Sequence, residues 1–362
     1  MNYVSLPAKP FFLVSRKPLF SFSLHIIPAI KMSTFTNNPS ELSPSISLQN
    51  YPKPLSPPLP AISKEIELAR AMSASSRSSL FSLSASEVLF EDQWLMAVNK
   101  PQGIYCEAVL TSVPALLLSR SKTAPVVPAI DVCVADNTKG SPELHLANRL
   151  DRDTSGVMII TKSHKVAAKL VKAFTDHKVR KTYIASCVGP SPDWKRITVK
   201  SGHGRSKFGA WRVYAASDAG RILPGGSSVR DMETSFEVLS VNGKRRSLGE
   251  SLEEECGETI VVKEKSVKCG NNGGGGEMQD EVLIRAFPRS GRTHQIRLHC
   301  QFIGLSIKGD VKYEGVHEWD GEVCSGHELH AESLSFEHPM TGLPMKVHAP
   351  LPSWATHLLP ES

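Results

Sequence analysis

The sequence has few of the features that mark membrane-spanning, disulfide-stapled or zinc-binding proteins. Its seven cysteines, at positions 106, 133, 187, 256, 269, 300 and 324, include no Cys-x-x-Cys pair. A scattered set of odd number argues against a disulfide framework and fits a reducing compartment. The apolar stretch Leu19–Ile30 is too short to span a bilayer and is interrupted by His25 and Pro28, so we expect no membrane partner.

Two familiar kinds of active site are also missing. The run Gly273–Gly276 lacks the strand and the Gly-Lys-Thr that a phosphate-binding loop requires. The segment Asp153-Thr-Ser-Gly is faintly similar to the Asp-Thr-Gly of aspartic proteases, and the chain holds no second copy of it. Because those enzymes need two carboxylates that share a proton, we exclude this class.

One group of residues has the composition of a zinc site. Cys324, His327 and His330 follow at three-residue steps, with His317 nearby. Zinc would need four ligands in a compact unit, whereas Glu328-Leu-His-Ala is typical of the start of a strand. We therefore predict no metal site here.

Charge is distributed unevenly along a chain of otherwise ordinary globular composition. Hydrophobic residues make up 40% of the 362 positions, and the net charge is +6. Residues 249–281 contain nine acidic residues and three lysines, which leaves +12 on the rest of the chain. A basic body with an acidic insertion favours a polyanionic partner, and a merely well-solvated surface is the alternative.

Composition also divides the N-terminal part of the chain. Residues 1–31 are basic and contain no Asp or Glu, which is typical of an organelle transit peptide. Translation from Met32 would instead give a cytoplasmic protein. Residues 32–86 form a leader, in which seven prolines between Pro39 and Pro60 predict a disordered linker and Ser63–Ala74 predicts a short helix.

The remaining sequence predicts one α+β domain at residues 87–355. Thr234–Leu239 and Val282–Phe287 are expected to pair around an acidic, Gly-rich insertion at about 242–281, which we interpret as a mobile surface loop. Thr293 is the expected N-cap of a helix to about Phe302. Further strands are predicted at Val88–Phe90, Trp94–Asn99, Val157–Thr161 and Thr182–Val188, and an amphipathic helix at Ser163–His177.

The most informative segment is His145-Leu-Ala-Asn-Arg-Leu-Asp-Arg-Asp-Thr-Ser-Gly-Val-Met-Ile-Ile-Thr161. It fixes Asp151 on a tight loop between two predicted strands, with Arg149 and Arg152 on either side. A carboxylate held among cations stays ionised at neutral pH, which suits a nucleophile or a base. A turn aspartate that only accepts backbone hydrogen bonds is the alternative.

This segment resembles the signature of the RluA-type RNA pseudouridine synthases, His-Arg-Leu-Asp-x-x-Thr-Ser-Gly, with Asn148 where the family usually has His. Since Asn can also donate and accept hydrogen bonds, we expect activity to survive the exchange. The resemblance covers about Glu87 to Pro352 and includes Lys100-Pro-Gln-Gly. Its other blocks are Arg180-Lys-Thr-Tyr-Ile-Ala, Arg289-Ser-Gly-Arg-Thr-His-Gln-Ile-Arg-Leu-His299 with Gly304 and Gly309-Asp-Val-Lys-Tyr313, and Leu329-His-Ala-Glu-Ser-Leu-Ser-Phe-Glu-His-Pro339.

The resemblance implies a fold and a reaction. The fold is a mixed, mostly antiparallel sheet with flanking helices and a central cleft. The reaction is isomerisation of uridine to pseudouridine in structured ribosomal or transfer RNA, without metal or cofactor, by a protein that we expect to be a monomer. Asp151 takes the main catalytic role, Tyr183 stacks on the detached base and can help the final deprotonation, and Arg297 pairs with the carboxylate. Whether the carboxylate attacks the base, attacks C1′ or removes a C2′ proton is left open.

The resemblance also implies RNA contacts. Arg149 is expected to help displace the target base from the RNA. Further contacts to base or phosphate are expected from Arg152, Lys181, Arg289, Arg292, His294, Lys308 and Lys312. The competing hypothesis is an RNA-binding protein that has lost catalysis, and the presence of Asp151, Tyr183 and Arg297 argues against it.

Overall fold

The computed structural model describes residues 50–123, 143–245, 257–264 and 279–359. The predicted transit peptide, the alternative start at Met32 and most of the predicted linker lie outside these residues. The helices are α1 (Ser63–Ser79), α2 (Cys106–Thr123), α3 (His164–Thr175), α4 (Gln295–Phe302) and α5 (Ser353–Leu358), with 3-10 turns at Ala85–Glu87, Ala216–Asp218 and Val311–Tyr313. None of the helices in the described ranges combines the length and apolarity needed to cross a membrane.

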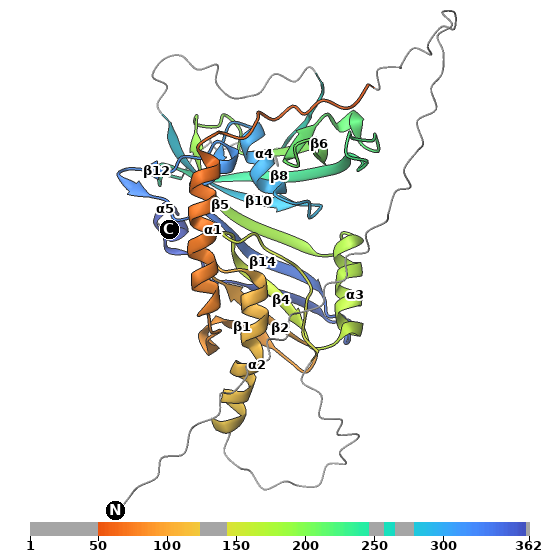
Figure 1. Cartoon of the computed structure of the whole chain (residues 1–362), viewed down its shortest axis with the longest axis vertical. Helices are drawn as coiled ribbons and strands as arrows, with labels where there is room; N and C mark the ends of the chain where they lie inside the picture. The colour runs from red at the N-terminus through yellow and green to blue at the C-terminus, as the bar shows by residue number, and fades with distance from the viewer. Residues whose placement is uncertain (1–49, 124–142, 246–256, 265–278, 360–362) are drawn as a thin grey trace, which may run out of the picture. The chain divides into compact units, whose positions relative to one another are not determined.

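The strands of the described residues form one large mixed sheet and one small ribbon (Figure 1). The large sheet contains β1 (Val88–Glu91), β2 (Leu95–Lys100), β3 (His145–Leu146), β4 (Ser155–Thr161), β5 (Arg180–Gly189), β6 (Arg196–Arg205), β7 (Trp211–Tyr214), β8 (Arg230–Val241), β9 (Glu258–Val261), β10 (Asp280–Pro288), β11 (Ser306–Ile307), β14 (Leu329–Glu337) and β15 (Pro344–His348). The ribbon pairs β12 (Glu318–Trp319) with β13 (Glu322–Val323).

The strand order shows how the two halves of the domain are joined. The main path is β1-β2-β4-β14-β5-β10-β8-β6-β7, and its pairs are antiparallel except β4 with β14; β9 at the margin also runs parallel to β6. This is the predicted α+β fold with a mostly antiparallel sheet. Because β4 comes early in the chain and β14 late, their pairing joins two halves of the domain at the middle of the sheet.

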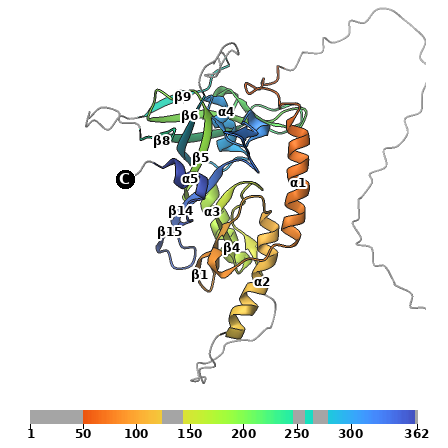
Figure 2. The same ribbon diagram turned by 90° about the vertical axis from the view of Figure 1, so that its left-hand side faces the viewer.

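Helices cover both faces of each half (Figures 1 and 2). In the β2–β4 half, α2 packs on Met96, Val98, Met158 and Ile160, while α3 packs on the alternate residues Leu95, Ala97, Val157 and Ile159. In the β5–β10 half, α4 packs on one face and α5 on the other. Tyr183 contacts both the α2 cluster and the α4 cluster. It therefore lies between these two helices on one face of the sheet.

The junction between the halves explains the glycine of the Thr-Ser-Gly motif. Gly156 lies opposite Ala331 where β4 and β14 run side by side, and its φ is +109°. A Cβ at Gly156 would overlap the backbone of Ala331, and the positive φ is unfavourable for other residues. Glycine thus allows the loop of Asp151 to enter the sheet next to β14.

Several predicted elements are confirmed and one cap is wrong. β8 and β10 pair across the insertion, and α3 begins after Ser163, whose hydroxyl accepts a hydrogen bond from the Val166 amide. The N-cap of α4, however, is His294 with φ +58°, one residue after the predicted Thr293. The left-handed backbone turns the imidazole of His294 toward Tyr313, with which it forms a 2.7 Å hydrogen bond.

Two segments that we expected to be a disordered linker and a mobile loop are partly packed against the domain. In the predicted disordered linker, the Leu55 amide donates to the Val213 carbonyl (2.8 Å), and α1 extends beyond the predicted Ser63–Ala74. Within the insertion, which we expected to be a loop, β9 pairs with β6 and Val262 is buried in the core. Residues 246–256 and 265–278 of the insertion lie outside the described residues.

Candidate active site

The loop that carries Asp151 is held from several sides. Asn148 accepts a hydrogen bond from the Ile159 amide (2.8 Å) and donates to the Val157 carbonyl (3.4 Å), which confirms that Asn can both donate and accept here. Behind the loop, the Sγ of Cys106 lies within hydrogen-bond distance of both the amide and the carbonyl of Leu150. The backbone before Asp151 is therefore fixed to β4 and to the start of α2.

A buried lysine holds the other end of this loop. Lys100 is fully buried, and its ammonium donates to the carbonyls of Pro101 (2.9 Å), Ile104 (2.8 Å) and Arg152 (2.9 Å). Burial lowers the pKa of Lys100 to about 8, so it remains largely charged at neutral pH. The sequence shows only a lysine before a Pro-Gln-Gly turn, and its role as a clamp depends on the fold.

Asp151 and a second aspartate share one arginine. Arg297 donates from Nη1 to Asp151 (2.8 Å) and holds Asp310 through Nε (2.6 Å) and Nη2 (2.8 Å). Arg297 and Asp310 are both buried, whereas the Asp151 side chain is 30% exposed. The predicted pairing of Arg297 with Asp151 is present. The two hydrogen bonds to Asp310 orient the guanidinium so that its Nη1 points at the Asp151 carboxylate.

The electrostatics favour an ionised carboxylate. Burial alone would raise the pKa of Asp151, but the Arg297 guanidinium outweighs it and holds this pKa well below its usual range. His294 lies with Nε2 3.7 Å from the same carboxylate, and burial, reinforced by Arg297, lowers the pKa of His294 to about 3. Asp151 is therefore charged beside a neutral imidazole at neutral pH.

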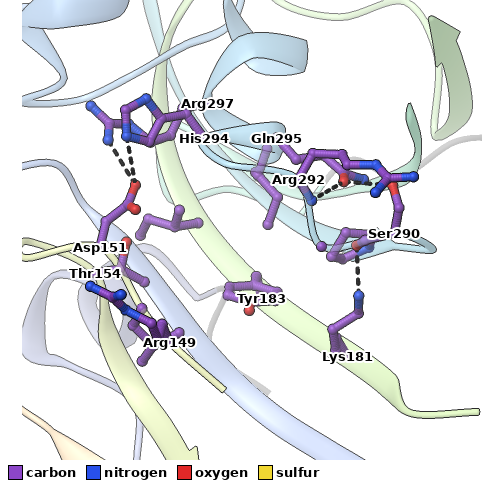
Figure 3. Close-up of a pocket in the computed structure, with 15 residues that line it drawn as sticks. Arg149, Asp151, Thr154, Lys181, Tyr183, Ser290, Arg292, His294, Gln295 and Arg297 are labelled. Carbon is purple, nitrogen blue, oxygen red and sulfur yellow. Dashed lines mark hydrogen bonds and ion pairs between the residues drawn. The ribbon is translucent and has the colours of Figure 1, made fainter. Parts of the chain in front are cut away.

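Most of the side chains predicted for the site line one pocket (Figure 3). Asp151 and Arg297 form one wall, Lys181 and Arg292 lie toward the other, and Tyr183 lies between them. Burial, and then the nearby Asp151 charge, raise the pKa of Tyr183 above its usual value, so its phenol stays protonated. The neutral tyrosine ring can stack on a planar base.

The basic residues of the pocket differ in how far they are already engaged. Arg149 is 74% exposed at the rim and pairs with Glu107 (3.0 Å). Lys181 donates to the Ser290 carbonyl (2.6 Å), and Arg292 donates to the Asp231 carbonyl (3.1 Å). All three line the pocket.

Arg152 and Lys308 are placed differently from our expectation of phosphate contacts. Arg152 is only 14% exposed, forms a two-pronged bond to Asp153 (2.7 and 2.6 Å) and contacts Glu67 (3.3 Å). Lys308 donates to Glu281 at 2.7 Å. Both cations are paired with carboxylates of the protein, and Arg152 also lines a second pocket beside Asp151.

The residues of the rejected zinc site have other partners. His327 Nε2 lies 2.7 Å from the Thr154 hydroxyl, and His330 Nδ1 lies 2.8 Å from the Ser155 hydroxyl. Both contacts bind the Thr-Ser of the motif to β14 and the turn before it. Within the described part of the chain, no group of three or more His, Cys, Asp or Glu residues is arranged to hold a metal ion.

Helix α1, which precedes the predicted domain, touches both sides of the site. Arg70 is buried and donates to the carbonyls of Gly309 (2.7 Å) and Cys324 (2.6 Å), next to the Asp310 that holds Arg297. One turn earlier on the same helix, Glu67 contacts Arg152 next to Asp151. Sequence reasoning missed both residues, because an Arg and a Glu on a polar helix give no signal of such contacts.

We expect Arg70→Met to lower kcat by about tenfold to a hundredfold, with KM changed less than twofold, because losing these bonds lets the Asp310 turn shift. Lys64→Met, on the exposed side of α1, is the matched control and should leave kcat unchanged. Steady-state kinetics and thermal melts on the purified full chain provide the test. A lower melting temperature with kcat unchanged in the folded fraction would show that Arg70 is only structural.

Comparison with known proteins identifies the class to which this site belongs. The family model described as RNA pseudouridylate synthase matches residues 95–302. The chain is 61% identical over 308 residues to the RNA pseudouridine synthase 1 of Arabidopsis thaliana, covering 84% of this chain and 87% of that protein. It is 54% identical to the rice protein of the same name, covering 88% and 87%.

A more distant bacterial relative is the ribosomal large subunit pseudouridine synthase C of Pasteurella multocida, 27% identical over 73% of this chain and 64% of that protein. The chain therefore belongs to the RNA pseudouridylate synthase family. Its activity is that of an isomerase, which converts uridine to pseudouridine in RNA, and the function and family predicted from the Asp151 motif are confirmed.

Proposed function

We propose that Asp151 is the catalytic carboxylate, acting without metal or cofactor on a uridine that enters the pocket above Tyr183. The observation that carries this is the contact of Asp151 with Arg297, itself fixed by Asp310, at the edge of the pocket. Isomerisation breaks the bond from C1′ to N1, rotates the uracil and forms a bond from C1′ to C5. The C5 proton is then lost and N1, which carried no proton in uridine, gains one, so the base keeps its composition.

All three routes left open by the sequence require Asp151 to be ionised. Attack on C1′, attack on the base and removal of a C2′ proton each start from a carboxylate, and the Arg297 contact keeps it in that form. Tyr183 supports the detached uracil by stacking.

The substrate we propose is a structured ribosomal or transfer RNA, bound by one copy of the chain. The name of the bacterial relative supports ribosomal RNA, and the basic rim formed by Arg149, Lys181 and Arg292 suits phosphates. A stacked or paired uridine costs a few kcal/mol to extract, which such contacts must offset.

For location, we propose import into a chloroplast or mitochondrion when residues 1–31 are translated, and a cytoplasmic form when translation starts at Met32. Support comes from the basic, acid-free composition of the leader. Its targeting role is separable from catalysis, because the described residues of the site all follow position 50.

One experiment tests substrate and location together. Pseudouridines are mapped by carbodiimide chemistry in total RNA from cells whose sole copy is wild type or Asp151→Ala. We expect one or a few sites in ribosomal or transfer RNA to vanish, and the compartment of that RNA identifies where the enzyme works. Loss of sites in another RNA class would overturn the substrate proposal, and no change with a folded, expressed variant would overturn the role of Asp151.

A further inference from the structure

The hairpin of β6 and β7 ends in an aromatic side chain that serves no purpose in the fold. Phe208 is 85% exposed and belongs to none of the hydrophobic clusters of the described residues. The turn around it is well defined, because the Ser206 amide donates to the Ala210 carbonyl and the Gly209 amide to the Ser206 carbonyl, both at 2.8 Å. The protein therefore presents this ring to solvent on a hydrogen-bonded turn.

Cations lie over the aromatic rings of this hairpin. The ammonium of Lys207 lies 4.9 Å from the centroid of Phe208, and the guanidinium carbon of Arg205 lies 5.4 Å from that of Trp211. Alternating cations and rings form the pattern by which proteins bind single-stranded nucleic acid: the cations meet phosphates and the rings stack on bases.

The hairpin is continuous with the wall of the pocket. The ring of Trp211 stacks on His203 (centroids 4.6 Å apart, planes at 16°), and His203 Nε2 donates to the Thr293 carbonyl at 2.9 Å. Thr293 lies between Arg292 and His294, which both line the pocket. From His203 the strand reaches Phe208 in five residues, which is about 17 Å at most.

The side chains of His203, Arg205 and Trp211 lie on the face of the sheet that carries α4. His203 and Arg205 alternate with Gly204 along β6, and Arg205 pairs with Trp211 across the hairpin, so all three side chains point to one side. Ser201, on the same face, contacts His299 of α4 at 2.9 Å. This is the face of the sheet that carries α4 and the pocket.

We propose that this hairpin binds the single-stranded RNA next to the target uridine, with one base stacked on Phe208 and neighbouring phosphates on Lys207 and Arg205. The proposal rests on the proposed function, since it requires an RNA whose uridine enters the pocket of Asp151. It adds a recognition surface outside that pocket, a few nucleotides away along the strand.

The test uses the full-length protein and the RNA site that the mapping identifies. We expect Phe208→Ala to weaken RNA binding and raise KM by about fivefold to a hundredfold with kcat and the melting temperature unchanged, while Phe208→Trp stays close to wild type. Leu343→Ala, which removes a 66% exposed apolar side chain on the turn between β14 and β15, should change neither value. Lys207→Gln should reduce the slope of log Kd against log salt by about one.

A shortened RNA decides whether the contact lies beside the uridine. When the flanking single strand is removed, wild type and Phe208→Ala should bind equally weakly, since the base that stacks is gone. Equal binding of the long RNA by wild type and Phe208→Ala would overturn the proposal. Binding is measured separately from turnover. A wild-type protein that makes no pseudouridine in this RNA would contradict the proposed substrate. The effect of Phe208→Ala on binding could still be measured.

Discussion

Asp151→Asn is expected to abolish pseudouridine formation, lowering kcat by at least about 10⁴-fold, while RNA binding changes less than about threefold. The substitution keeps the shape of the side chain and one hydrogen-bond acceptor for Arg297, but it removes the charge that all three mechanistic routes need. Single-turnover kinetics at saturating enzyme would measure the chemical step, and filter binding with the same RNA would measure affinity.

A matched variant separates chemistry from a general effect of lost charge near the pocket. Asp231→Asn removes an exposed carboxylate that contacts Arg292 at 3.3 Å, outside the Arg297 cluster. It should leave kcat within about threefold of wild type, as surface charge changes usually do. If Asp151→Asn retained substantial activity, the catalytic carboxylate would have to be sought elsewhere.

The second large effect is expected from Arg297→Met. This change leaves Asp310, which is 1% exposed, as a buried charge without its partner, and we expect a loss of about 3–5 kcal/mol in the free energy of unfolding at neutral pH. Catalysis should also fall, because Asp151 loses the group that orients it and holds its pKa down. Chemical denaturation and single-turnover kinetics would measure the two effects.

The pH dependence distinguishes this cause from a simple packing defect. In the wild type, burial would raise the pKa of Asp310, but Arg297 outweighs it and lowers this pKa below the unfolded value. This stabilisation is present above the unfolded pKa and is lost as the pH falls through the folded one. In Arg297→Met the main group that opposes burial is gone and the folded pKa rises, so the destabilisation should shrink as the pH is lowered from 7 to 5.

Arg285→Met is the control for a paired arginine away from the site. Arg285 also binds a carboxylate with two bonds, to Glu332 at 2.9 and 3.1 Å, but it is 31% exposed and lies across from Ile184, on the α5 face. We expect a loss of about 1 kcal/mol and unchanged kcat. A destabilisation by Arg297→Met that did not vary with pH would contradict the buried-charge explanation.

The catalytic loop could be predicted from the sequence because its signal is local. Asp151 between two apolar runs, with glycine at position 156, determines a carboxylate on a tight turn. Tyr183 and Arg297 could be placed beside it only through the family resemblance, since 32 and 146 residues separate them from Asp151. They meet because Tyr183 projects from β5 on the face of the sheet against which α4, with Arg297, packs.

Residues that hold the site from a distance could not be found in the same way. Asp310 appeared only as part of a matching block, and nothing in the sequence shows that it binds Arg297 through two bonds. Arg152 looked like a phosphate contact because its charge is visible while the neutralising Asp153 and Glu67 contacts are not. Asp153 is adjacent to Arg152 in sequence, but only the fold shows that the two side chains pair. Glu67 is remote in sequence, and the fold brings it to Arg152.

The packed leader shows a second limit of composition. Prolines between positions 50 and 60 indicate an extended chain, and the chain is extended there, but the exposed edge of β7 offers it a hydrogen-bonding partner at Val213. Leu55 and Leu59 then pack on the main core. Whether an extended segment is loose or docked depends on the surface beside it, which composition cannot describe.

Nucleoside analysis of one purified reaction tests the central claim most directly. The RNA named by the mapping is incubated with wild type or Asp151→Asn, digested to nucleosides and separated by chromatography. The account predicts that wild type converts one uridine per RNA to pseudouridine in a metal-chelating buffer, and that Asp151→Asn gives none while still binding the RNA. Pseudouridine made at the same rate by Asp151→Asn would contradict the assignment of this carboxylate as the catalytic group.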